Sequence, residues 1–141
     1  MPTKLSAISR PAFMVYGPAS VTPPAVQLWQ TEVFDNTNSF DLPSGRFTAP
    51  VAGLYFFAAS VVAEPGTAGQ AAAEVFAYRK NGAKLYTRTA YSGVTTAHTP
   101  ITATLLIKLA QGDVIDLYLS ASATLFQAND ALSSFSGFLV G

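Results

Sequence analysis

The sequence predicts an all-β domain built as a sandwich of two packed sheets. Short segments rich in Val, Phe, Tyr, Thr and Leu are separated by 10 glycines and 9 prolines, a pattern that indicates many short strands joined by turns. Only 11% of the residues are charged, against about a quarter in an average globular chain. With 141 residues the chain has the length of one domain with a single core.

The predicted strands follow one another with short connections. The best defined turn is Asn81-Gly82, the dipeptide that most readily adopts positive φ in a two-residue hairpin. A second tight turn is predicted at 110–114. Strands are expected at 12–16, 27–34, 45–50, 53–63, 72–80, 83–91, 100–110, 113–121 and 133–140.

Alternation separates two kinds of strand. Within 113–121 one face carries Ile115, Leu117 and Leu119 and the other carries Asp116, so one side of this strand should meet solvent. The strand at 53–63 is apolar on both faces, and a sandwich covers only its inner faces. A second copy of the chain is the expected cover, while a loop or extra strand of the same chain is the alternative.

Composition argues against several partners and sites. Eight basic and eight acidic residues leave no net charge to attract nucleic acid or an anionic membrane surface. The absence of cysteine excludes disulfides and thiolate metal sites. No apolar run approaches the length that spans a bilayer, and the N-terminal residues do not have the pattern of a signal peptide.

Several motifs, in this order and spacing, resemble one family over Ala12 to Val140. They are "AF" at 12–13, "FDLPSGRFTAPVAGLYFF" at 40–57, "KNG" at 80–82, "LLIKLAQGDVIDL" at 105–117 and "SSFSGFLV" at 133–140. Together they resemble the globular head of the complement C1q family, within the tumour necrosis factor (TNF) superfamily. The resemblance implies a ten-stranded jelly roll that assembles as a homotrimer around a threefold axis, with the termini together at its base.

The resemblance also assigns the strands to sheets. Residues 12–16, 53–63, 100–110 and 133–140 would form an inner sheet that packs towards the neighbouring subunits, and 113–121 would lie in a solvated outer sheet. Residues 1–11 are expected to form an anchoring arm ahead of the domain at 12–141. The residues expected in the trimer interface or the core, without a choice between the two, are Phe13, Tyr55, Phe57, Leu106, Phe135 and Phe138.

Residues for catalysis are scarce, so we expect no enzyme, cofactor or metal. His98 is the single histidine and lies in the polar stretch "GVTTAHTP". There is no Gly-x-Ser-x-Gly motif, and no histidine lies near the serines at 133–136. Asp35 and Asp41 are interpreted as Asx-turn residues, with a loop calcium site as the alternative, although no Asp-x-Asp spacing supports calcium.

Two features are candidates for contact with a partner. Arg79, Lys80, Lys84 and Arg88 flank the Asn-Gly hairpin and would suit an acidic partner, or would simply form a solvated hairpin tip. Trp29 lies between polar neighbours in "QLWQTE" and is expected to be a partially exposed anchor.

The hypothesis that follows is a non-enzymatic trimeric structural protein, most plausibly a phage virion component. A short head without cysteine, leader or collagen stalk is similar to the bacterial and phage versions of the family. It would be a capsid decoration (cement) protein, or the head of a short fibre or spike, assembled in the host cytoplasm on capsid or tail proteins. The alternative is a lectin-like or receptor-binding module that uses the loops at 64–71 and 92–99.

Overall fold

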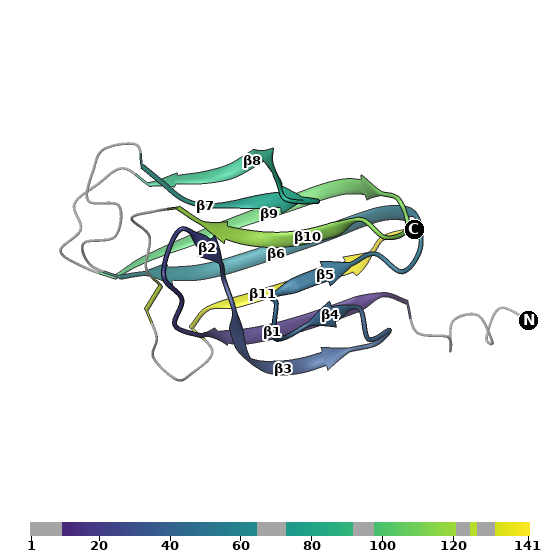
Figure 1. Cartoon of the computed structure of the whole chain (residues 1–141), viewed down its shortest axis with the longest axis horizontal. Coiled ribbons are helices and arrows are strands. Elements are labelled where there is room, and N and C mark those ends of the chain that lie inside the picture. Colours follow the sequence, from purple (N-terminus) through teal and green to yellow (C-terminus); the bar gives the residue numbers. More distant parts are fainter. Residues whose placement is uncertain (1–9, 65–72, 92–97, 121–124, 127–131) are drawn as a thin grey trace, which may run out of the picture.

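The computed structural model describes residues 10–64, 73–91, 98–120, 125–126 and 132–141, and within them the chain is a sandwich of two sheets (Figure 1). The described strands are β1 (Ala12–Pro18), β2 (Ala25–Val26), β3 (Trp29–Asp35), β4 (Phe40–Asp41), β5 (Arg46–Thr48), β6 (Gly53–Ala63), β7 (Ala73–Lys80), β8 (Ala83–Tyr91), β9 (Thr99–Leu109), β10 (Val114–Leu119) and β11 (Ser134–Leu139).

The strand order is that of a jelly roll. The five-stranded sheet runs β3-β1-β11-β6-β9, and the six-stranded sheet runs β4-β5-β10-β7-β8 with β2 paired to β10. The pairs β1–β11, β6–β9 and β5–β10 are antiparallel and join strands far apart in sequence. The predicted sandwich and the assignment of strands to sheets are therefore confirmed. Strands β2 and β4, of two residues each, were not predicted.

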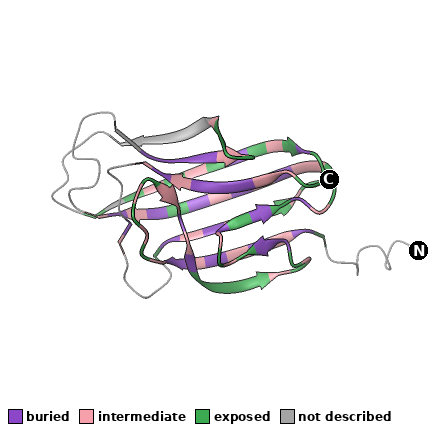
Figure 2. Ribbon diagram, viewed as in Figure 1, coloured by how far each residue is buried: buried purple, intermediate pink, exposed green. Residues whose placement is uncertain are grey.

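Aromatic side chains fill the space between the sheets. Successive residues of a strand point to opposite faces, so every second residue of β1, β6 and β11 is buried (Figure 2). The rings of Phe13 and Phe47 stack with centroids 5.2 Å apart, and Phe13 meets Phe135 edge-on at 5.1 Å. Gly137 leaves room for this cluster, because a Cβ atom there would overlap the ring of Phe57.

Hydrogen bonds join two turns at one end of the six-stranded sheet. Asn81 and Gly82 have φ values of 52° and 84°, which confirms the predicted hairpin turn. Asn81 Nδ2 donates to Asp113 Oδ1 at 3.0 Å, and Val114 N donates to Asn81 Oδ1 at 2.8 Å. The bond from Asn81, with another from Ala110 N, lowers the pKa of Asp113. The polar side chains therefore fix two adjacent connections.

The aspartates of the first loop serve its backbone. The carboxylate of Asp35 accepts hydrogen bonds from Ser39 N at 3.0 Å and Phe40 N at 2.8 Å, and Asp41 accepts one from Ser44 N at 3.1 Å. Both aspartates therefore stabilise loop backbone, but through N–H donors three to five residues further on, and not through the donor two residues on that defines an Asx turn. Within the described residues, no group of three or more His, Asp or Glu side chains is placed to hold a metal ion.

Trp29 corrects a prediction. It is 3% exposed and lies in the core beside Phe135, with ring centroids 6.2 Å apart. Its polar sequence neighbours Gln30 and Thr31 are exposed on β3, which is one of the two edge strands of the sheet. The polar neighbours of Trp29 are therefore explained by the edge position of β3. The Trp29 side chain itself is buried and is not an exposed anchor.

Candidate functional site

The outer face of the five-stranded sheet carries large apolar side chains in register. Ala12, Phe138, Phe56 and Leu106 stand directly opposite one another on β1, β11, β6 and β9. Leu106 is 54% exposed and Phe138 is 47% exposed, and the rings of Phe56 and Phe138 lie 5.7 Å apart. We call the outward residues of this region the apolar face: Ala12, Met14, Phe34, Leu54, Phe56, Ala58, Leu106 and Phe138.

The edge strand β3 extends the apolar face. Phe34 is 42% exposed and stands opposite Met14, which points to the same side as Ala12. A bulge between Met14 and Val15 shifts the register, so that Val33 on β3 has no opposing residue on β1. Val33 is 52% exposed. Apolar side chains therefore follow one another across all five strands of the sheet.

Towards the other end of the sheet the same face becomes polar. Two positions along from Phe56 and Leu106 lie Ala58 and Thr104, and two further along lie Ser60 and Thr102. The hydroxyls of Ser60 and Thr102 lie 3.3 Å apart and share a hydrogen bond. The face is therefore graded, with apolar rows near the end of β11 and hydroxyl rows near its beginning.

One cation lies at the apolar end. Among the described outward residues of β1, β6, β9 and β11, Lys108 alone is charged, and it stands opposite Leu54. Beside it is a hollow of about 330 Å³, lined by Ala52, Gly53, Leu54, Lys108, Leu109 and Gly141. Lys108 is exposed, so its ammonium group can reach water at the rim of the apolar face.

The structure divides the six predicted interface or core residues. Four of them, Phe13, Tyr55, Phe57 and Phe135, are at most 1% exposed and belong to the core, whereas Leu106 and Phe138 lie on the apolar face. Reasoning from the sequence missed the outward partners Leu54 and Phe56 of β6. Ser60 lies on the same side of this strand, and its polarity was the one signal that this side faces outward.

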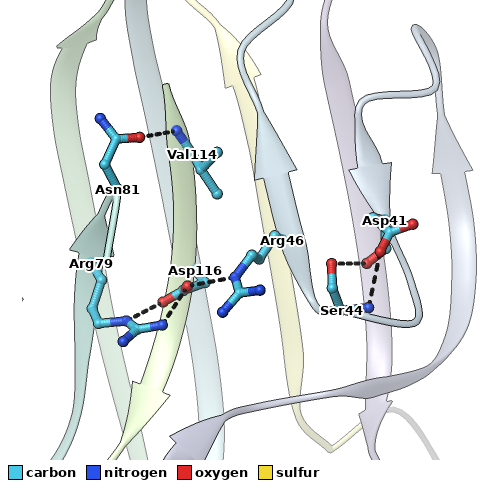
Figure 3. A network of polar contacts seen from close by, with 7 residues as sticks. All are labelled: Asp41, Ser44, Arg46, Arg79, Asn81, Val114 and Asp116. Carbon is cyan, nitrogen blue, oxygen red and sulfur yellow. Dashed lines mark hydrogen bonds and ion pairs between the residues drawn. The ribbon is translucent and has the colours of Figure 1, made fainter. Parts of the chain in front are cut away.

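The basic residues predicted to contact a partner lie on β7 and β8 of the other sheet, and Figure 3 shows one of them, Arg79. Arg79 binds the carboxylate of Asp116 through Nε at 2.8 Å and Nη2 at 2.9 Å. These hydrogen bonds raise the pKa of Arg79, and its guanidinium carbon lies 4.0 Å from the ring centre of Tyr118. Lys80 lies 3.6 Å from Asp113. Lys84 is exposed, and the side chain of Arg88 lies outside the described residues.

The arrangement of Asp116 corrects the expectation of a solvated strand face. Its side chain is only 2% exposed, because Arg79 donates to both carboxylate oxygens and Arg46 Nε also approaches Oδ2 at 3.2 Å. A buried carboxylate of this kind is tolerated only when it is paired and hydrogen-bonded. Sequence reasoning placed Asp116 on the wet side, and the two arginines cover it there.

The remaining polar candidates have structural partners. His98 Nε2 lies 3.5 Å from Glu64 Oε1, and its ring lies 4.1 Å from that of Phe126. Ser133 is buried, and its hydroxyl accepts a hydrogen bond from Val62 N at 3.0 Å. Neither contact is the nucleophile–base pair that acyl transfer needs. Within the described residues, no helix is long and apolar enough to cross a membrane.

Solved structures of other proteins have the same fold. The globular domain of a zebrafish complement 1qA protein superposes with a TM-score of 0.70 and 18% identity, covering 94% of this chain and 98% of that one. Murine APRIL at pH 5.0 gives a TM-score of 0.68 and 16% identity, covering 94% of this chain and 100% of that one.

Comparison at the level of sequence families agrees with the fold. No curated protein sequence matches the chain. A family model described as C1q domain matches residues 12–140, nearly the whole length of the chain. The strand order, the buried aromatic cluster and this match agree, and the chain belongs to the C1q domain family.

Proposed function

We propose that the chain works as a non-enzymatic homotrimer whose subunits associate through the apolar face. The observation that carries this proposal is the exposure of Leu106, Phe138 and Phe34 on one face of one sheet. Monomeric proteins seldom expose contiguous apolar patches beyond a few hundred Å². Cyclic association of three copies would cover this face and would leave the six-stranded sheet in solvent.

Interfaces between permanent partners resemble a domain core, and the apolar rows suit that role. Full burial of a Leu or Phe side chain stabilises by about 1.5–3 kcal/mol relative to full exposure. The hydroxyl rows at Ser60 and Thr102 would form a more polar part of the same interface, where water can bridge the subunits. The apolar rows are therefore expected to supply most of the association energy.

Measurement of mass in solution tests the trimer directly. Sedimentation equilibrium over a dilution series into the low micromolar range should give three times the chain mass of 14.8 kDa. The trimer should persist at high salt, because apolar burial is not screened by ions. A stable monomer at these concentrations would overturn the proposal.

We further propose that this trimer is a structural component of a phage virion. A block with threefold symmetry suits the threefold and quasi-threefold points of a capsid shell, where a decoration protein would contact capsid proteins, or the tip of a short fibre or spike. Its assembly would take place in the host cytoplasm. The proposed anchoring arm joins the domain at Arg10 and Pro11, which form hydrogen bonds with Val140 and Leu139 at the end of β11.

The virion proposal has its own test. Mass spectrometry of purified particles should find the chain in a fixed ratio to the major capsid or tail protein. Its absence from the particles would reject the placement without affecting the trimer. Clear hits on a glycan array would instead favour the recognition alternative, whose loops at 64–71 and 92–99 lie mostly outside the described residues.

A further inference from the structure

The hairpin turn at Asn81 and Gly82 carries a chemical reactivity that the fold restrains. The chain has four asparagines, and only Asn81 is followed by glycine. Loss of the side-chain amide of an asparagine begins when the backbone nitrogen of the next residue attacks the amide carbon, and glycine hinders this attack least because it has no Cβ. Asn81 and Gly82 are both exposed, and a Cβ added to Gly82 would meet no atom within 4 Å. The sequence and the open turn therefore both favour reaction at Asn81.

The reaction needs water and no enzyme. Gly82 N forms a bond to Asn81 Cγ, the bond from Cγ to Nδ2 breaks, and the amide leaves as ammonia with the proton that Gly82 N gives up. The product is a cyclic imide. Water then opens the imide at either of its carbonyl carbons. One opening gives aspartate at position 81, and the other gives iso-aspartate, in which the main chain runs through the former side-chain carbon.

Both polar atoms of the Asn81 amide are held by the neighbouring turn. Asn81 Nδ2 donates to Asp113 Oδ1 at 3.0 Å, and Val114 N donates to Asn81 Oδ1 at 2.8 Å (Figure 3). Attack by Gly82 N requires one particular approach to the amide carbon. A side chain that is bonded at both ends of its amide cannot rotate freely into that approach, so the reaction must first break these bonds.

We propose that Asn81 is a site of non-enzymatic modification to aspartate and iso-aspartate, and that Asp113 is the positioning residue that holds its amide back from reaction. Asp113 is itself fixed, because its carboxylate also accepts a hydrogen bond from Ala110 N at 2.8 Å. A hydrogen bond to a carboxylate is about twice as strong as one between neutral groups. Opening of this contact converts a stable turn residue into a reactive one.

Modification would weaken the link between the two turns. An aspartate at position 81 replaces the donor Nδ2 by an oxygen, so a second carboxylate would face Asp113 across the contact that is now 3.0 Å long. Lys80, which lies 3.6 Å from Asp113, could balance only one of the two negative charges. Iso-aspartate adds an atom to the main chain and no longer fits a two-residue turn in which both residues have positive φ.

Peptide mapping by mass spectrometry measures the reaction during incubation of the full chain in mildly alkaline buffer, where Gly82 N loses its proton more readily. Asp113→Ala should speed the conversion of Asn81 about tenfold, the effect of losing one charge-assisted hydrogen bond. Asp113→Asn retains an uncharged acceptor and should speed it less. Asp41→Ala is the matched control, because it removes the acceptor of Ser44 N in a different turn and should leave the rate unchanged. The unaltered chain should react faster in urea than in the folded state.

Several results would overturn the proposal. Equal rates in the folded and the urea-unfolded chain would show that the fold does not restrain Asn81, and this comparison holds even where Asp113→Ala fails to fold. Equal acceleration by Asp113→Ala and Asp41→Ala would show that general loosening sets the rate. Absence of conversion at Asn81 in the unfolded chain would reject the site. Asn81→Asp should lower the melting temperature, and an unchanged value would reject the proposed effect on the turns.

Discussion

Replacement of Leu106 by Glu tests the trimer at one position of the apolar face. Leu106 is 54% exposed in the single chain, so covering the remaining surface should contribute about 1 kcal/mol per copy, or about 3 kcal/mol per trimer. That loss alone shifts the association constant about a hundredfold. Burial of an unpaired carboxylate in each of the three copies adds a further penalty of several kcal/mol unless the carboxylates are protonated.

Sedimentation and light scattering should therefore find Leu106→Glu as a folded monomer at concentrations where the unaltered chain is a trimer. The fold should survive, because Leu106 points away from the core and exposed substitutions usually change stability by about 0.5 kcal/mol or less. Thr48→Glu adds the same charge to the exposed face of the six-stranded sheet and should remain trimeric. If both variants dissociate equally, or neither does, the apolar face is not the interface.

Three further predictions concern the stability of the single domain. Asp116→Asn should lower the free energy of unfolding in urea by about 2–3 kcal/mol, because Arg79 and Arg46 lose their charged acceptor; Asp41→Asn should cost clearly less. The pKa of Asp113 is lowered in the folded state, so its stabilising contribution is present above its ordinary value of 3.8 and is lost as the pH falls through the lowered value. Asp113→Asn should therefore flatten the acid limb of the stability profile, and an unchanged limb would contradict this role. Gly137→Ala should destabilise by about 2 kcal/mol through overlap with Phe57, while Ser136→Ala on the outer side should have little effect on the melting temperature.

The fold could be predicted because local and long-range signals agreed. The Asn81-Gly82 turn fixes the β7–β8 hairpin, and the long apolar run of β6 marks a strand with a neighbour on each side in its sheet. The unpredicted strands β2 and β4 are pairings of two residues each, which carry no periodicity. Long strands leave a pattern in the sequence, while short pairings depend on which neighbour the fold brings alongside.

The candidate site was only half predictable, because a strand with two apolar faces does not reveal which face points inward. Tyr55 and Phe57 fill the core, whereas Phe56 lies between them on the outer side. The difference is set by Phe13 and Phe47, which pack against Phe57 from other strands. Asp116 was misjudged for a related reason, since its burial depends on Arg46, which lies 70 residues away in the sequence.

The two outer faces of the sandwich differ in the kind of partner that they can bind. The apolar face depends on area and shape, so it should favour a permanent partner with a matching surface, such as another copy of the chain. The outer face of the six-stranded sheet instead carries charged side chains that pair with one another, Asp116 with Arg79 and with Arg46. Burial of this face against a second copy would remove water from exposed charges such as Arg46, so the proposed trimer should leave it in solvent. Asp41→Asn changes the charge of this face and leaves the apolar face unaltered, so it should not change the dissociation constant of the trimer. A weakened trimer in this variant would show that the charged face takes part in the interface.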